Sequence, residues 1–270
     1  MNVLQNIQEV QRVFKSAQQL ALKSSFNDDL FEQLNALSNE FRSVAYEGAS
    51  FSIALNSIST KGNLDTWKQY LVQTKGLHDS QIHVGLGWAL ASQNSNIEEH
   101  ILNIDPYMVS RVIDGYGYYY AIFKRRIAIR TAQIPESISD VNKMAFDQGV
   151  GRSLWYLSEG KLEKLTRFLL LIPANRHADL WRGIGIAFAY VGGTSEVSHI
   201  EKLSDKHLID FKTGVALALH SRMKSGSTLE SSTIIGEKSF NNLDQTLDKI
   251  SNFNVSDLYS TSILDLQQAF

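Results

Sequence analysis

The sequence predicts an all-α protein in which about six helical hairpins form a TPR-like superhelix or an α/α toroid, with glycine-opened helices as the inner layer. Three observations predict this fold. Only three prolines occur in 270 residues, and Leu, Ala, Gln and Lys are frequent, which favours helices over a β-sandwich. Six segments share one glycine-led pattern at a regular spacing. The segments between them have helical periodicity.

The glycine-led segments define the inner layer. Each begins with an acidic or polar residue, followed by glycine and then by small residues that alternate with large apolar ones. The leading glycines are Gly48, Gly85, Gly115, Gly149, Gly183 and Gly214. Their separations of 37, 30, 34, 34 and 31 residues average about 33, which is the length of a two-helix solenoid repeat.

A longer period indicates a duplication. Gly85 and Ala89 match Gly183 and Ala187 at an offset of 98 residues. We therefore expect two related blocks of three hairpins. The predicted organisation is an N-terminal helical segment (1–40), a helical-repeat domain (41–225) and a C-terminal helical extension (226–270).

The glycines within helices need a compensating reason, because glycine costs up to ~1 kcal/mol per helical site relative to alanine. Small residues four apart, such as Gly183 and Ala187, would let a neighbouring helix approach closely. Alternatively, glycine at a helix start would let backbone N–H groups bind an anion. We favour close packing, because the glycines continue along each helix.

The intervening segments 65–72, 162–172 and 196–203 predict outer helices, and a further helix is expected near 243–250. The tyrosines in residues 116–123 favour a β-strand as an alternative interpretation of that segment. Their i, i+3, i+4, i+7 spacing favours a helix that ends before the basic run 124–126.

Composition excludes several classes of protein. A net charge of −2 and a pI near 6.4 provide no field for nucleic acid, so we expect no nucleic-acid partner. The absence of cysteine excludes disulfides and thiolate chemistry. Residues 1–20 lack the apolar core of a signal peptide, and the apolar stretch 183–193 is too short to span a bilayer, so we expect a cytoplasmic protein without a membrane span.

The sequence lacks the motifs of common cofactor sites. It contains no complete Gly-x-Gly-x-x-Gly, no P-loop and no His-Glu-x-x-His. Glu196 and His199 have the spacing of one di-iron ligand pair, but such sites require two copies. We expect no cofactor and no metal.

Acidic residues lie near the predicted starts of the inner helices: Glu47, Asp114, Asp147 and Asp179. Capping and stabilisation of the helix dipole explain them most simply. A catalytic carboxylate is the alternative. The candidates for general acid or base are Asp114, Asp147 and His83.

Gln148, Arg152 and Trp155 follow an i, i+4, i+7 pattern, so that one helix face is expected to carry an amide, a guanidinium and an indole. A buried arginine requires a partner. Either Arg152 pairs with an acid such as Asp114 or Asp179, or this face lines a cavity.

Aromatic residues are frequent in the inner segments and would serve mainly in packing. If the inner helices curve around a groove, these residues would instead form an apolar lining for a long unsaturated ligand. With Glu47, Gln148 and Arg152, the candidate ligand-binding residues are Tyr116, Tyr119, Trp155 and Trp181, and His83 and Trp88 add aromatic character.

The glycine-led motifs resemble the signature of a domain-of-unknown-function family, which is encoded beside enediyne polyketide synthases and in other bacterial natural-product gene clusters. The resemblance spans roughly 41–222 and rests on residues 46–49, 84–90, 114–117, 146–155 and 178–185. It implies a bacterial protein of polyketide biosynthesis and transfers no catalytic residue.

Two hypotheses follow. In the first, the protein binds or modifies a polyene or polyketide chain, free or linked to a carrier protein, in a concave aromatic groove. Arg152 would hold a carboxylate or a carrier-linked carbonyl. In the second, it is a non-catalytic helical-repeat scaffold that binds a partner biosynthetic enzyme or a peptide.

Overall fold

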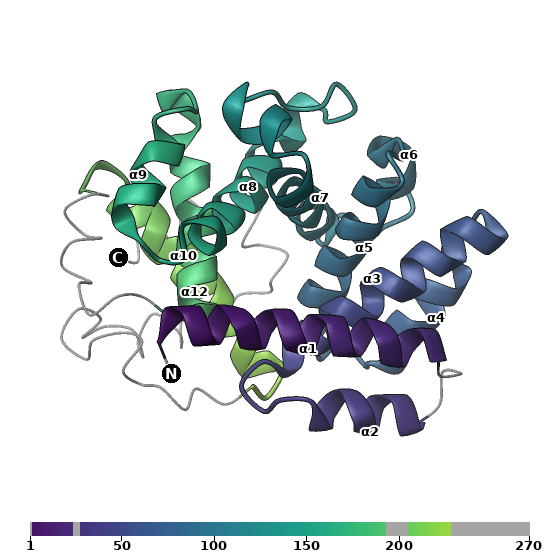
Figure 1. The fold of residues 1–270 in the computed structure, drawn as a ribbon. Coiled ribbons are helices and arrows are strands. Elements are labelled where there is room, and N and C mark those ends of the chain that lie inside the picture. The colour runs from purple at the N-terminus through teal and green to yellow at the C-terminus, as the bar shows by residue number, and fades with distance from the viewer. Residues whose placement is uncertain (1, 24–27, 193–204, 228–270) are drawn as a thin grey trace.

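A computed structural model describes residues 2–23, 28–192 and 205–227. Every regular element in these ranges is helical, which confirms the predicted all-α class (Figure 1). Residues 116–123 lie within a helix, so the strand alternative is wrong. The α-helices are α1 (Val3–Lys23), α2 (Asp28–Ala36), α3 (Arg42–Lys61), α4 (Asp65–Gln73), α5 (Asp79–Ser92), α6 (Ile97–Ile101), α7 (Val109–Phe123), α8 (Lys143–Ser158), α9 (Leu162–Leu169), α10 (His177–Val191) and α12 (Leu208–Lys224). The remaining elements are a π-helical segment, Arg126–Arg130, and 3₁₀ turns at Asp140–Asn142, Ala174–Arg176 and Asp205–His207.

The long helices pack side by side in the order in which they follow along the chain. Helix α1 packs on α3, α3 on α5, α5 on α7, α7 on α8, α8 on α10, and α10 on α12. The short helices α4, α6 and α9 lie in the connections between them, where α4 packs on α3, α6 on α7 and α9 on α8. The predicted outer helices at 65–72 and 162–172 correspond to α4 and α9.

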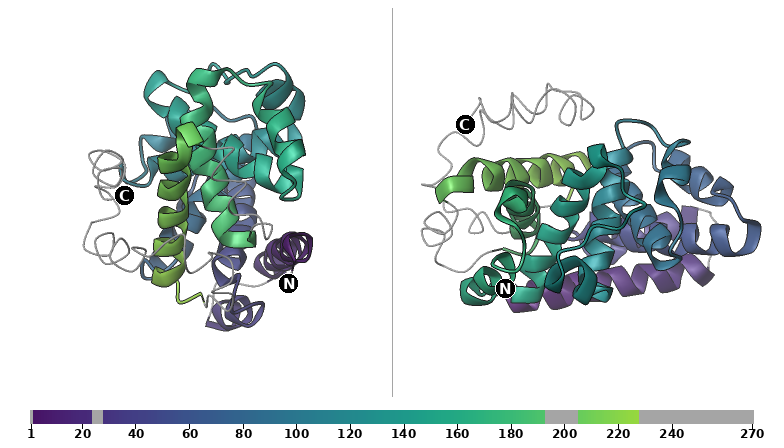
Figure 2. Two further views of the ribbon diagram at one scale, coloured as in Figure 1. Left: turned by 90° about the vertical axis from the view of Figure 1, so that its left-hand side faces the viewer. Right: turned by 90° about the horizontal axis from the view of Figure 1, so that it is seen from above.

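The row of long helices curls, so that late helices meet early ones (Figures 1 and 2). Asn6 on α1 donates a hydrogen bond of 3.0 Å to the carbonyl of Val191 at the end of α10. Gln81 on α5 donates from its amide nitrogen to Tyr190 on α10 (2.7 Å) and to Ser221 on α12 (2.8 Å). The long helices therefore share one interior.

Glycine permits the close packing of these helices. A methyl group added to Gly183 on α10 would lie 2.7 Å from the backbone nitrogen of Arg152 on α8, and one added to Gly149 would lie as close to the nitrogen of Tyr118 on α7. A Cβ atom does not come this close to a backbone atom of a neighbouring helix. Each leading glycine meets backbone of the preceding long helix in this way, so the close-packing interpretation is confirmed.

The expectation that glycine opens these helices is wrong. Each leading glycine is the seventh residue of its helix: α3 begins at Arg42 and reaches Gly48, and α10 begins at His177 and reaches Gly183. About one and a half helical turns precede each leading glycine. Residues in these turns, such as Val44 and Ala45 of α3, are buried in the core, and this packing stabilises the helix before the glycine.

The N-terminal helix packs in the same core as the later ones, since Val13 and Ala17 of α1 are fully buried. The expected outer helix at 196–203, the expected helix at 243–250 and almost all of the extension at 226–270 lie outside the described residues. No helix in the described part of the chain is long and apolar enough to cross a membrane.

Candidate functional site

One stripe of each long helix from α3 to α12 faces the shared interior. The stripe consists of the tenth and fourteenth residues of each helix, three and seven positions after its leading glycine, which are one helical turn apart. All of them line one of two cavities. The tenth residues are Phe51, Trp88, Tyr118, Arg152, Ile186 and Leu217. The fourteenth residues are Leu55, Ser92, Ile122, Tyr156, Tyr190 and Ser221.

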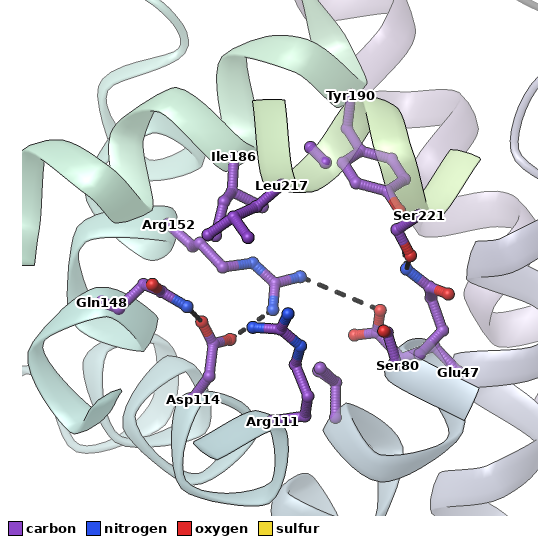
Figure 3. A pocket seen from close by; sticks show the side chains of 13 residues that line it. Glu47, Ser80, Arg111, Asp114, Gln148, Arg152, Ile186, Tyr190, Leu217 and Ser221 are labelled. Carbon is purple, nitrogen blue, oxygen red and sulfur yellow. Dashed lines mark hydrogen bonds and ion pairs between the residues drawn. The ribbon is translucent and has the colours of Figure 1, made fainter. Parts of the chain in front are cut away.

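The first cavity is small and polar, with a volume of about 40 Å³. Figure 3 shows side chains from α3, α5, α7 and α8 converging on it. Ile186 and Leu217 form an apolar edge. Its polar lining includes Glu47, Gln81, Arg111, Asp114, Gln148 and Arg152.

The second cavity, here called the aromatic cavity, has a volume of about 600 Å³ and lies between α1, α3, α5, α7 and α8. Trp88 lies on its wall, with its ring 5.1 Å from the ring of Phe14 and 4.9 Å from that of Tyr118. The other aromatic residues on its wall are Phe51, Tyr119, Phe123, Tyr156 and Tyr190. Its volume is in the range of small-molecule binding sites.

Four polar residues form a charged cluster where the two cavities meet: Glu47, Asp114, Gln148 and Arg152. The guanidinium Nη1 of Arg152 donates to Oδ1 of Asp114, and Gln148 donates to Oδ2 of Asp114 at 2.6 Å. Arg152 Nη2 lies 3.9 Å from Oε2 of Glu47, beyond hydrogen-bond distance. Glu47 and Arg152 line both cavities.

Burial shifts the pKa values of this cluster. Desolvation raises the pKa of Glu47 to about 7, although Arg152 opposes the shift. Burial disfavours the charged form of Arg152 as well, but Asp114 and Glu47 outweigh it and raise the pKa of Arg152, which stays protonated. The ring of Tyr118 adds a cation–π contact, with its centroid 4.8 Å from Arg152 Cζ. Asp114 matches the charge of Arg152, whereas Glu47 is neutral or charged according to pH.

Both alternatives that the sequence leaves open for Arg152 are realised, because it pairs with Asp114 and also lines a cavity. The predicted face of Gln148, Arg152 and Trp155 is only partly correct. Gln148 and Arg152 line a cavity, but Tyr156 and not Trp155 is the next residue of α8 that does so. The indole of Trp155 donates to the carbonyl of Gly192 at 3.0 Å and packs on Phe188.

The structure places other predicted site residues away from both cavities. Asp147 is bound by Arg176 through both of its carboxylate oxygens, one of them at 2.7 Å from Arg176 Nε. The ring of His83 packs edge-on against Trp67, and its Nδ1 lies 2.7 Å from the carbonyl of Asp79.

Two more predicted aromatic residues have packing roles. Tyr116 stacks on Tyr120 with ring centroids 4.9 Å apart, and Trp181 packs edge-on against Phe211. Of the predicted aromatic ligand-binding residues, Tyr119 is the one that lines the aromatic cavity.

Sequence reasoning missed most of the cavity wall, including Phe14, Phe51, Tyr118, Tyr156 and Tyr190. A signal for four of them was present, because they lie three or seven residues after a leading glycine. Phe14 comes from α1, which has no such glycine.

Within the described residues, no group of three or more His, Asp or Glu side chains is arranged to hold a metal ion. The fold and the site define an all-α protein with a charged cluster on the wall of an aromatic cavity. The chain belongs to the DUF1702 family of proteins of unknown function, which matches residues 2–249. No curated protein and no solved structure matches it.

Proposed function

We propose that the protein binds a long unsaturated molecule, of the polyene or polyketide type, in the aromatic cavity and acts on it in natural-product biosynthesis. The observation that carries this proposal is that Glu47 and Arg152 of the charged cluster line an aromatic cavity of about 600 Å³. The resemblance to proteins of bacterial natural-product gene clusters supports the type of ligand.

The wall of the cavity favours flat, conjugated molecules. Ring faces and edges from Trp88, Tyr118 and Tyr119 offer offset and edge-on contacts to a π system. Polar residues, among them Glu47 and Arg152 of the charged cluster, complete this mainly aromatic and apolar wall. Such a distribution suits a ligand with an apolar body and a polar end group.

The charged cluster favours a carbonyl group over a carboxylate as the polar end of the ligand. Arg152 is already bonded to Asp114, so a ligand carboxylate at Arg152 would compete with that residue for the same guanidinium group. A buried charge without its own partner is costly. A neutral ketone or a carrier-linked thioester avoids this cost, and it accepts hydrogen bonds from Arg152 or from protonated Glu47.

The architecture fits this function if the six glycine-bearing helices are copies of one repeat. We propose that two blocks of three hairpins form a superhelix around the ligand. The seventh-residue glycine and the inward tenth and fourteenth residues, which recur in all six helices, support this origin.

Fluorescence of diphenylhexatriene, a neutral aromatic polyene, tests the proposal. Binding should increase the emission of diphenylhexatriene. The bound dye should also accept excitation energy from Trp88, which lies on the cavity wall. Ile122→Trp places a large ring in the cavity and should abolish binding. The matched control is Val72→Trp, at a side chain that is 75% exposed, and it should bind as the wild type does. Equal binding by both variants would contradict the proposal.

A partner-binding scaffold is the second candidate. Several large apolar side chains in the connections between long helices are exposed to solvent, among them Val72 (75%), Leu102 (83%) and Leu170 (77%). Exposed apolar side chains of this kind are typical of contact surfaces when they gather into a patch. Purification with a stoichiometric protein partner, and without a small molecule, would favour this function.

A further inference from the structure

We infer that Glu47 is a catalytic residue that moves a proton on a carbonyl-conjugated ligand and thereby shifts one of its double bonds. This inference rests on the proposed function, since it requires the ligand to occupy the aromatic cavity. It assigns the substrate class as β,γ-unsaturated carbonyl compounds and their conjugated isomers.

The geometry singles out Glu47 among the buried acids. Among the described residues, it is the one carboxylate that lines the aromatic cavity. Asp114 has both oxygens engaged, by Arg152 and by Gln148. Asp147 likewise has both oxygens bound by Arg176. Glu47 lines the aromatic cavity, and its Oε2 lies 3.9 Å from Nη2 of Arg152, which lines the same cavity.

The reaction needs only a carboxylate and a nearby cation. Ionised Glu47 removes a proton from the carbon between the carbonyl group and the double bond. The electron pair of that C–H bond forms a new C=C bond, and the carbonyl π electrons move onto oxygen to give a dienolate. Protonated Glu47 then returns the proton to the far carbon of the original double bond. Atoms and electrons balance, and the carboxylate is regenerated.

Arg152 lies where it can stabilise the dienolate. Its Nη1 is held by Asp114, whereas its Nη2 points toward Glu47 across a gap of 3.9 Å. A carbonyl oxygen beside Nη2 would receive a charge-assisted hydrogen bond as negative charge develops on it. The raised pKa of Glu47, about 7, supports the assignment, because the group can accept and donate a proton near neutral pH.

The test uses the full chain and allyl phenyl ketone, a small β,γ-unsaturated aryl ketone. Wild-type protein should convert it to the conjugated propenyl ketone, followed by ultraviolet absorbance, and calorimetry should measure its binding. Glu47→Gln should lower kcat by at least about a hundredfold while binding is kept, since general acid–base catalysis contributes that much. The control, Glu163→Gln, alters a carboxylate that is 80% exposed and should leave the rate unchanged.

The outcomes separate this inference from the proposed function. If the ketone binds to wild-type protein without isomerising, or if Glu47→Gln isomerises it at the wild-type rate, Glu47 is not catalytic and the binding function stands. If neither the ketone nor diphenylhexatriene binds, both fail. Glu47→Asp draws the carboxyl group back by one methylene and should retain part of the activity, so a folded Glu47→Asp variant with the full rate would also contradict the inference.

Discussion

Glu47 is a buried carboxyl group beside an arginine that is already paired. Arg152 lies 3.9 Å away but is bonded to Asp114, so the attraction only partly offsets the cost of desolvation. A carboxyl group with a raised pKa in the folded state makes stability depend on pH.

Glu47→Gln should therefore change the pH dependence of stability. Because the folded pKa of about 7 lies above the ordinary value of 4.5, the contribution of Glu47 is fully present below about pH 4.5 and is lost as pH rises to about 7. Glutamine does not titrate. Relative to wild type, the variant should gain up to about 3 kcal/mol in the free energy of unfolding between these pH values. Denaturant unfolding across that range measures it, and a constant difference would contradict the assigned pKa.

Arg152 has a structural role as well as a place on the cavity wall. Arg152→Ala should lower the free energy of unfolding by about 3–5 kcal/mol, since Asp114 and Glu47 would lose their nearest cation. The matched control is Arg167→Ala, whose partner Glu163 is 80% exposed, and it should cost less than about 1 kcal/mol. Similar losses in the two variants, measured by denaturant unfolding, would show that the charged cluster does not stabilise the fold.

At the scale of the elements, the glycines explain how the long helices can lie side by side. Their spacing in the sequence identified which segments form the inner layer, and the structure confirms close packing at those positions. The starts of the helices could not be predicted equally well. None of the helices α3, α5, α7, α8, α10 and α12 has a side-chain hydrogen bond at its N-cap, so the usual sequence signal for a helix start is missing.

Gly183→Ala separates packing from helix propensity. Propensity alone predicts a gain of up to ~1 kcal/mol. Because the added methyl group would overlap the carbonyl oxygen of Gln148 and lie 2.7 Å from the backbone nitrogen of Arg152, both on α8, we expect a loss of more than about 3 kcal/mol in the free energy of unfolding. Gly62→Ala, with open space around it and φ of 65°, should cost only about 1–2 kcal/mol. Thermal unfolding compares them, and a stabilised Gly183→Ala would refute the packing account.

At the scale of the whole molecule, the curl of the helix row decides which side chains line the cavities. Periodicity placed Glu47, Asp114, Gln148 and Arg152 on inner helices, and the structure brings these four together. Periodicity could not decide which of two neighbouring residues, such as Trp155 and Tyr156, lines the cavity. That choice depends on how α8 is rotated against α7 and α10, which long-range packing determines.

The curl also joins the apolar and charged parts of the site. Residues of α1 meet those of α5 and α7 only because α1 crosses the row (Figure 1), as the ring of Phe14 beside Trp88 shows. No local pattern in the sequence predicts such a contact. Binding of a long unsaturated ligand in this interior is therefore a property of the whole molecule and needs a measurement on it.

Native mass spectrometry of the intact protein, purified from the organism that encodes it, is that measurement. We expect a bound small molecule whose mass adds to that of the protein and which, once released, absorbs light as a conjugated chain does. The cavity-filling Ile122→Trp variant should lose it, and Val72→Trp should keep it. Protein that carries no small molecule, or one that Ile122→Trp retains in full, would contradict this expectation.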